Sequence, residues 1–222
     1  MTDQQRLTIF AGHYGSGKTS IAVSFALHRR SRGENVVIGD LDIVNPYFRT
    51  SDSRERLEAA GVELVCSRHA GSNLDIPALP KELYAVVSDK SRTAVLDVGG
   101  DDVGAVALGR FASLVQAAND YEMLFVVNFF RPLMRTAEEA LAILHEVEAA
   151  SGLRFTGIVH NSNIGTETMA EHVLSAVPKL EELSKTSGLP VVMTAVTEQT
   201  AKALKGTIEH LFVIQAQSFG IA

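Results

Sequence analysis

The chain has little cysteine, proline or tryptophan. Its 222 residues include one cysteine, six prolines and no tryptophan. The single cysteine, Cys66, cannot form an internal disulfide, and its position in the apolar run 62–66 predicts a buried thiol in a cytoplasmic protein. The few prolines do not gather into a linker, and the chain has no low-complexity segment. We therefore expect one domain that spans residues 1–222.

The sequence also lacks long apolar runs and long basic runs. No apolar stretch reaches the roughly 18 residues of a membrane-spanning helix, and residues 1–6 lead directly into a predicted strand, which leaves no room for a signal peptide. Lys and Arg number 20 against 26 Asp and Glu, for a net charge of −6, which disfavours nucleic acid as the main partner. An apolar-faced helix over 208–219 lacks the basic face of a membrane-surface helix, so we expect it to pack on the domain.

Glycine, in contrast, is abundant, with 17 residues, and three of them lie in one short segment near the N-terminus. The segment matches G-x-x-x-x-G-K-[ST], the pattern of a phosphate-binding P-loop. Its glycines let successive backbone N–H groups point at one phosphate. Lys18 would bind the outer phosphates, and the hydroxyl of Thr19 would ligate a magnesium ion. The predicted nucleotide-binding residues of this segment are Gly12, His13, Tyr14, Gly15, Ser16, Gly17, Lys18, Thr19 and Ser20.

The sequence on either side of this segment favours the same interpretation. Residues 7–11 form a short apolar run typical of a strand, and residues 21–27 form an apolar run without Gly or Pro that is typical of a helix. The helix would present its positive N-terminal end to the same phosphate. An ordinary glycine-rich turn is the alternative, but the order strand, loop, helix is the context that a P-loop requires.

Acidic residues follow two other predicted strands. Asp40 and Asp42 come at the end of the apolar run that begins at residue 35, and Asp97 ends the run that begins at residue 93. Because ligands of open α/β sheets bind beyond the carboxyl ends of the strands, we expect these acids beside the P-loop. Asp42 is predicted to position the attacking water, and Asp40 and Asp97 to support the magnesium shell. Capping of the next element is the alternative for the first two.

Two glycines that follow Asp97 after one intervening valine predict a hinge. Gly99 and Gly100 would give this segment freedom to move and a backbone N–H able to sense a terminal phosphate. The next two residues, Asp101 and Asp102, are expected to be solvated. Arg49 follows the first acidic pair, and it either neutralises charge on the phosphates or is solvated.

Seven predicted strands alternate with helices along the chain. The run 122–128 is continuously apolar between its first and last residues, which is typical of a parallel strand covered on both faces. Thr136 and Glu139 predict a capping box at the start of a helix, and a helix over 166–177 is expected to end or kink at Pro178. This alternation predicts an α/β fold with three layers, in which helices cover both faces of a mostly parallel seven-stranded sheet.

The order of these motifs resembles the MinD/ParA-like branch of P-loop nucleoside triphosphatases. The resemblance rests on residues 12–19, Asp40, Asp42, residues 97–100 and Asn161, and it covers nearly the whole chain. This branch includes the nitrogenase iron protein, the Mrp-type carriers, the cobyrinate synthases and the dethiobiotin synthetases. The resemblance implies ATP and Mg²⁺ as cofactors and a nucleotide-dependent homodimer. It also implies that Asn161 reads adenine, with the capping of a turn as the alternative.

Some features of that family are altered in this chain. Where the family carries a second lysine that reaches the partner's phosphates, this chain has His13, a shorter group with an ordinary pKa near 6.5. Either this histidine is protonated against the phosphates, or the protein does not use the contact between subunits. One cysteine cannot supply the paired thiolates of an interfacial iron–sulfur cluster. The sequence has no N-K-x-D, which reads guanine in the related GTPases, and this favours ATP over GTP.

Three functions fit these observations. The preferred hypothesis is a magnesium-dependent ATPase that acts as a switch on a partner protein, with ATP ordering the loops around Asp42 and residues 99–100. The runner-up is an ATP-dependent enzyme that activates a substrate carboxylate, for which Arg49, Arg131 and Arg135 are available. The third is a nucleotide-sensing adaptor with little turnover, which the histidine in the P-loop would suit.

Overall fold

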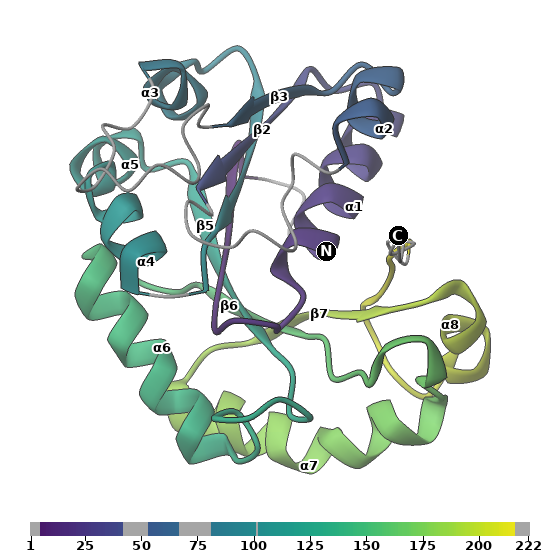
Figure 1. Ribbon diagram of the computed structural model, residues 1–222. Helices are drawn as coiled ribbons and strands as arrows, with labels where there is room; N and C mark the ends of the chain where they lie inside the picture. Colours follow the sequence, from purple (N-terminus) through teal and green to yellow (C-terminus); the bar gives the residue numbers. More distant parts are fainter. Residues whose placement is uncertain (1–4, 42–52, 67–80, 101, 216–222) are drawn as a thin grey trace, which may run out of the picture.

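The computed structural model describes residues 5–41, 53–66, 81–100 and 102–215. Within these ranges, eight parallel strands form one sheet in the order β3-β2-β4-β1-β5-β6-β7-β8 (Figure 1). The strands are β1 (Leu7–Ala11), β2 (Val36–Leu41), β3 (Glu63–Cys66), β4 (Thr93–Val98), β5 (Tyr121–Val127), β6 (Gly157–His160), β7 (Val191–Val196) and β8 (Leu211–Val213).

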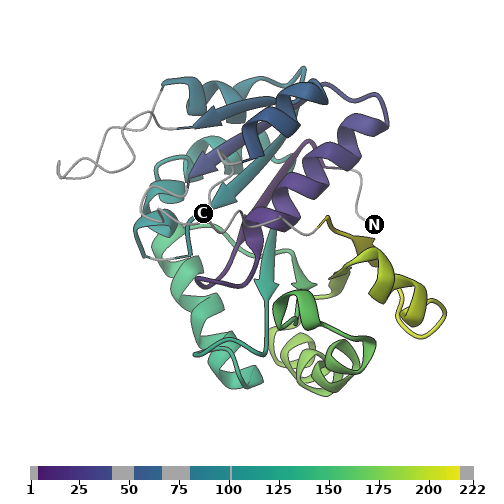
Figure 2. The same cartoon turned by 45° about the vertical axis from the view of Figure 1, so that its right-hand side comes forward.

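Helices cover both faces of the sheet, so the fold has the three layers that the sequence predicts (Figure 1). The first two helices pack on one face, and α3 to α7 supply the cover of the other. Figure 2 shows α1 lying across the sheet, with α8 beside β8 at one end of it. None of the described helices combines the length and the apolar character needed to cross a membrane. The helices are α1 (Lys18–Ser31), α2 (Arg54–Ala59), α3 (Lys81–Ser88), α4 (Asp102–Gly109), α5 (Ala112–Ala118), α6 (Ala137–Ser151), α7 (Ala170–Ser187) and α8 (Glu198–Leu204), with a 3₁₀ turn, η2 (Gly165–Glu167).

Strand β1 lies inside the sheet, between β4 and β5. All five of its residues are buried, because successive side chains point to opposite faces and both faces are covered. Ile9 contacts the α3 to α7 layer, and Phe10 contacts the layer that contains α1. The loop that follows this strand therefore lies in the middle of the carboxyl edge, where parallel α/β sheets bind ligands.

The sheet has eight strands instead of the predicted seven. The additional strand, β8, pairs with β7 and lies in the segment 208–219, so the helix prediction is wrong for residues 211–213. Phe212 is buried with its ring centroid 6.2 Å from that of Phe25 on α1, whereas Val213 is exposed. A short apolar run fits a strand as well as a helix, and here the packing against α1 favours the strand.

Of the two outcomes predicted at Pro178, an end of the helix or a kink, the first is not found, because helix α7 continues through the proline to Ser187. It also begins at Ala170, later than predicted, because η2 occupies residues 165–167. A proline inside a helix costs about 3 kcal/mol or more through the lost hydrogen bond and a steric clash. Val173 before the proline and Leu180 after it are both buried, and the burial of this continuous apolar face offsets that cost.

Two local predictions have different outcomes. The predicted capping box of α6 is present. The Thr136 hydroxyl accepts a hydrogen bond from the backbone N–H of Glu139 (3.2 Å), and Glu139 Oε2 accepts one from the N–H of Thr136 (3.2 Å).

Cys66, in contrast, is half-buried, whereas the sequence predicts a buried thiol, and Arg54 Nη2 lies 3.1 Å from its Sγ. The thiol is accessible because β3 is an edge strand, which has a neighbour on one side alone.

Candidate functional site

The loop between β1 and α1 forms a tight turn at the carboxyl edge of the sheet. The backbone N–H of Ser16 donates to the carbonyl of His13 at 3.2 Å. Gly17 precedes the first residue of α1 with a φ of 91°, which glycine adopts without strain. A Cβ atom at this position would also clash with the side-chain nitrogen of Asn161. The first N–H groups of α1 have no partner within the helix, so this end of the helix can bind an anion.

Lys18 is the first residue of α1, and its side chain folds back over the loop. Its Nζ donates a hydrogen bond of 3.0 Å to the carbonyl of His13. The residue is buried, with 6% of its surface exposed. The ammonium group is thus held at the mouth of the turn, and on this side it faces the segment after β4.

The segment after β4 approaches the loop closely at Gly100. A Cβ atom built on Gly100 would lie 2.5 Å from the backbone nitrogen of Tyr14 and 2.7 Å from Lys18 Nζ. Only a residue without a side chain fits between them. The predicted hinge therefore touches the predicted phosphate loop, so a group bound at Lys18 can influence the position of this segment.

His13 and Tyr14 form the outer part of the loop. His13 is partly buried, and desolvation by burial, followed by the positive charge of Lys18, lowers the pKa of its imidazole below 6.5. Without a bound anion, the environment of the imidazole thus disfavours the positive charge that a second lysine would carry. Tyr14 is half exposed at 50%, so its ring is available at the surface beside the loop.

Two acids predicted to support a metal lie side by side. Asp40 near the end of β2 and Asp97 near the end of β4 are paired in register, and both are buried, with 5% and 1% exposed. Asp97 is also paired with Phe10 of β1, just before the loop. Thr19 lies one residue after Lys18 in α1 and is partly buried. The structure thus brings two carboxylates to the strand edge from which the loop starts.

Asn161 follows β6 and is attached to the loop by its side chain. Its Nδ2 donates a hydrogen bond of 2.7 Å to the carbonyl of Ser16, and its backbone N–H donates to the carbonyl of Val127 at 2.8 Å. The residue is 2% exposed. Its Oδ1 is buried and accepts no hydrogen bond from any residue that the structure describes. A buried acceptor left in this way costs about 1–3 kcal/mol.

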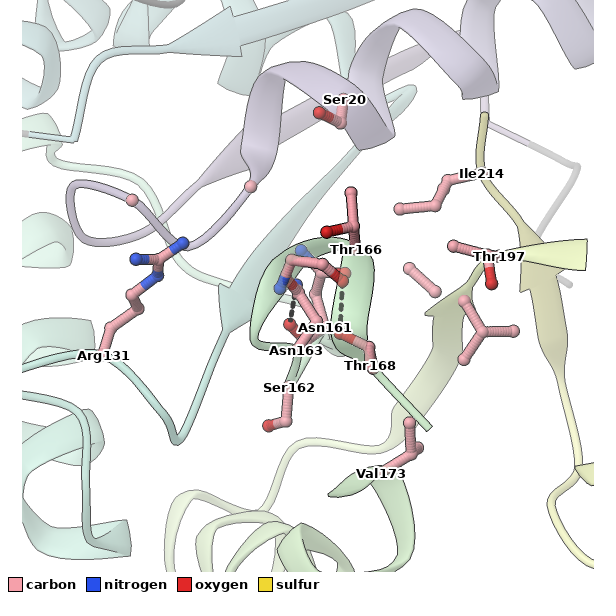
Figure 3. A pocket seen from close by; sticks show the side chains of 15 residues that line it. Ser20, Arg131, Asn161, Ser162, Asn163, Thr166, Thr168, Val173, Thr197 and Ile214 are labelled. Atoms are coloured by element: carbon pink, nitrogen blue, oxygen red, sulfur yellow. Dashed lines mark hydrogen bonds between the residues drawn. The ribbon is translucent and has the colours of Figure 1, made fainter. Parts of the chain in front are cut away.

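A cavity of about 190 Å³ lies next to this asparagine (Figure 3). Its wall comes from five parts of the chain: the loop with the start of α1, the segment after β5, the segment from β6 to α7, the end of β7 and the residue after β8. The cavity is partly open to solvent. The lining residues are Gly15, Gly17, Ser20, Arg131, Asn161, Ser162, Asn163, Gly165, Thr166, Thr168, Val173, Ala195, Val196, Thr197 and Ile214.

The sequence predictions miss most of this wall. Asn128 follows β5 and holds the segment after β6 in place, because its Nδ2 donates to the carbonyl of Asn163 at 3.2 Å and its Oδ1 accepts from the N–H of Asn163 at 3.3 Å. The Ser162 hydroxyl accepts from the N–H of Phe129 at 3.1 Å. The detectable signal is polar side chains directly after two adjacent apolar strands, a pattern that indicates a shared edge.

The structure does not place every predicted residue. Asp42 and Arg49 lie outside the described residues, so their predicted roles stay predictions, and the same holds for the expected solvation of Asp101. Of the other two arginines considered for substrate binding, Arg131 lines the cavity and Arg135 does not.

Comparison with solved structures identifies the fold. The chain is similar to the cell division protein FtsY of Thermotoga maritima, with a TM-score of 0.62 and 16% identity over 87% of this chain and 62% of that one. For FtsY of Mycoplasma mycoides the TM-score is 0.61 and the sequence identity 16%, over 90% of this chain and 62% of that one. The 54 kDa signal recognition particle protein of Aeropyrum pernix was solved in complex with GDP. Its TM-score is 0.57 and its sequence identity 18%, over 87% of this chain and 42% of that one.

These similarities show a three-layer P-loop nucleoside triphosphatase fold. The chain spans 62% of the length of the two FtsY structures. No protein-family model and no curated protein sequence matches it. The fold is thus established at low sequence identity, and the narrower MinD/ParA-like assignment stays a prediction.

Proposed function

We propose that the protein binds ATP with Mg²⁺ at the loop 12–19, hydrolyses it, and acts as a nucleotide-driven switch on a partner protein. The observation that carries this proposal is the direct link between the loop and the cavity through Asn161. The phosphates would lie on the loop, and the base and sugar would lie in the cavity. One asparagine would then contact both parts of the nucleotide site.

The choice of adenine rests on the free acceptor of Asn161. Its Nδ2 is already bonded to Ser16, so the group left for a ligand is the buried Oδ1. Adenine carries a 6-amino group that donates hydrogen bonds, whereas guanine carries an acceptor oxygen at that position. An adenine 6-amino group would satisfy the buried oxygen, and a guanine O6 at the same place would repel it.

GTP is the second candidate nucleotide. It is favoured by one specific observation, because the similar signal recognition particle protein of Aeropyrum pernix was solved with GDP. The sequence here argues against it, since residues 160–163 read His-Asn-Ser-Asn and contain no carboxylate to pair with the donor groups of guanine. A direct comparison of the two nucleotides decides between them.

The residues beside the loop fit a magnesium ion. The carboxylates of Asp40 and Asp97 and the hydroxyl of Thr19 are oxygen donors, which Mg²⁺ prefers, often through bound water. A bound Mg²⁺ would neutralise part of the charge on the phosphates. Lys18 supplies a fixed positive charge on the same side, within a buried environment where it is weakly screened.

The proposed switch depends on the close approach of Gly100 to the loop. ATP at Lys18 would hold the segment after β4, and the loss of the terminal phosphate would release it. Asp42 is proposed to position the attacking water. Beyond Gly100, α4 exposes Val103 and Val106, at 39% and 47%, and a partner protein or a second copy of the chain could read their displacement.

Calorimetry and phosphate release test this function together. We expect ATP to bind in millimolar Mg²⁺ more tightly than GTP, and Lys18→Ala to lose this binding. Phosphate release without any added substrate supports the switch, whereas release that depends on an added carboxylate supports the activating enzyme. Tight ATP binding with no release supports a nucleotide sensor. The absence of heat from both ATP and GTP would overturn the proposal.

A further inference from the structure

Arg131 is a basic residue at the cavity with no role in the function proposed so far. It lies in the segment between β5 and α6, and its backbone is held at both polar groups. Its N–H donates to the carbonyl of Asn128 at 3.0 Å, and its carbonyl accepts from the N–H of Met134 at 3.3 Å. This anchored turn gives the arginine a defined starting point at the rim of the cavity.

The side chain of Arg131 extends from that turn towards the phosphate loop. A Cβ atom built on Gly15 would lie 3.7 Å from both Cδ and Nε of Arg131, so the arginine side chain lies beside the loop at this glycine. Figure 3 shows the guanidinium group next to the loop, at the opposite side of the cavity from Thr197 and Ile214. The planar group therefore borders the place where the loop and the cavity meet.

The guanidinium of Arg131 makes no ion pair and no side-chain hydrogen bond with any residue in the part of the chain that the structure describes. Other arginines of the protein do, since Arg6 pairs with Asp120 at 2.7 Å and Arg29 pairs with Glu34 at 2.7 Å. A guanidinium is always charged, and its donors match phosphate oxygens two at a time. The N–H donors of the Arg131 guanidinium thus face the loop, and their geometry suits phosphate oxygens.

Two cations would then flank the loop from different sides. Lys18 Nζ lies beside His13 and Gly100, whereas Arg131 lies on the side of the cavity, together with Gly15 and Ser20. The sugar and base would enter from the cavity. The phosphates nearest to Arg131 are consequently those nearest to the sugar, which ADP and ATP share.

We propose that Arg131 binds these inner phosphates and supplies, from within the same chain, a second positive charge for the nucleotide. Its position differs from that of His13, which lies on the outer part of the loop beside Lys18. The inference rests on the proposed nucleotide binding. It also gives a reason for nucleotide affinity that needs no lysine from a second subunit.

The test compares Arg131→Ala with Arg135→Ala by calorimetry, using ATP, ADP and adenosine with Mg²⁺. Arg135 is a matched control because it lies in the same segment, is exposed and does not line the cavity. We expect Arg131→Ala to weaken ATP and ADP by the same factor, about tenfold or more, and to leave adenosine unchanged. Arg135→Ala should stay within about twofold of the parent protein for all three ligands.

Two further measurements sharpen this outcome. Arg131→Lys should recover part of the affinity, because it restores the charge without the planar pair of donors. The affinity of Arg131→Ala should also depend less steeply on salt concentration than that of the parent. Because the side chain is exposed, thermal unfolding should show that the variants fold like the parent.

Each remaining result counts against the inference. ATP and ADP binding by Arg131→Ala within twofold of the parent would overturn it while leaving the proposed nucleotide function intact. A loss for ATP with no loss for ADP would place the arginine at the terminal phosphate, contrary to the proposal. If the parent protein itself binds none of the three ligands, the proposed function fails and this inference fails with it.

Discussion

The side-chain nitrogen of Asn161 donates a 2.7 Å hydrogen bond to the carbonyl oxygen of Ser16, a residue 145 positions earlier in the chain. The bond is buried, and it joins the segment after β6 to the loop after β1. The amide orientation follows from this bond, because a carbonyl can accept from the nitrogen of the side chain and not from its oxygen. The remaining oxygen is thereby identified as a buried acceptor on a residue that lines the cavity.

This geometry predicts how Asn161 discriminates between bases. Asn161→Ala should weaken ATP binding about tenfold, since one buried hydrogen bond is lost and the loop loses its link. In the parent protein, ITP, which has an oxygen in place of the 6-amino group, should bind about tenfold more weakly than ATP. In Asn161→Ala the two nucleotides should bind equally. Calorimetry of the four combinations gives the coupling directly.

A result that contradicts this assignment is easily recognised. If the parent binds ATP and ITP equally, Asn161 does not read the 6-amino group and serves as a structural link alone. If Asn161→Ala keeps the full preference for ATP, another group of the cavity wall reads the base.

The phosphate loop was accessible to prediction because its chemistry is local in sequence. The motif 12–19 contains the glycines, the lysine and the hydroxyl within one turn of chain, and the acids end apolar strands that are recognisable by themselves. The parallel sheet with helices on both faces follows from alternating strand and helix patterns. These features need no knowledge of distant contacts.

The cavity wall and the eighth strand were not accessible in the same way. Arg131 and Gly15 are far apart in sequence, and nothing in either segment indicates that they line the same cavity. Strand β8 exists because Phe212 packs near Phe25 and pairs with β7, while its short apolar run fits a helix as well. Pro178 shows the opposite case, in which a helix with buried residues on both sides of a proline does not end there.

Gly100 provides a test of the contact between the predicted hinge and the loop. Gly100→Ala places a methyl group 2.5 Å from Tyr14 N and 2.7 Å from Lys18 Nζ, so either the loop or the lysine must move. We expect nucleotide affinity to fall at least tenfold, measured by calorimetry, with a modest effect on folding. Gly33→Ala is a suitable control, because nothing lies within 4 Å of the added group there. It should cost about 1 kcal/mol of stability through its positive φ and leave binding unchanged.

Two acids with different predicted roles, Asp97 for the magnesium shell and Asp42 for the attacking water, should have different effects on phosphate release. Asp97→Asn removes a charge beside Asp40 and should raise the Mg²⁺ concentration needed for half-maximal phosphate release by about tenfold.

Asp42→Ala should keep ATP binding and reduce hydrolysis by two orders of magnitude or more, as expected for loss of a group that positions water. Both are checked by phosphate release at a series of Mg²⁺ concentrations. Normal hydrolysis by Asp42→Ala would remove its proposed role.

His160 predicts the pH dependence of stability. It ends β6 between Val127 and Thr194 in the sheet register, is fully buried, and neither ring nitrogen has a hydrogen-bond partner among the described residues. Desolvation by burial lowers the pKa of this imidazole from 6.5 to about 4. Between these two pH values the unfolded chain binds a proton at this position and the folded chain does not.

Stability should consequently fall as the pH decreases from 6.5 to about 4, by roughly 3 kcal/mol from this one residue, and no further below that. His160→Leu removes the titrating group and places an apolar side chain in the core. The carboxylates are the same in both proteins, so the difference in unfolding free energy between variant and parent isolates the contribution of His160. Urea unfolding at pH 7.0, 5.5 and 4.5 measures it. The variant should gain stability relative to the parent as the pH falls, whereas a constant difference would mean that the imidazole is charged or solvated in the folded protein.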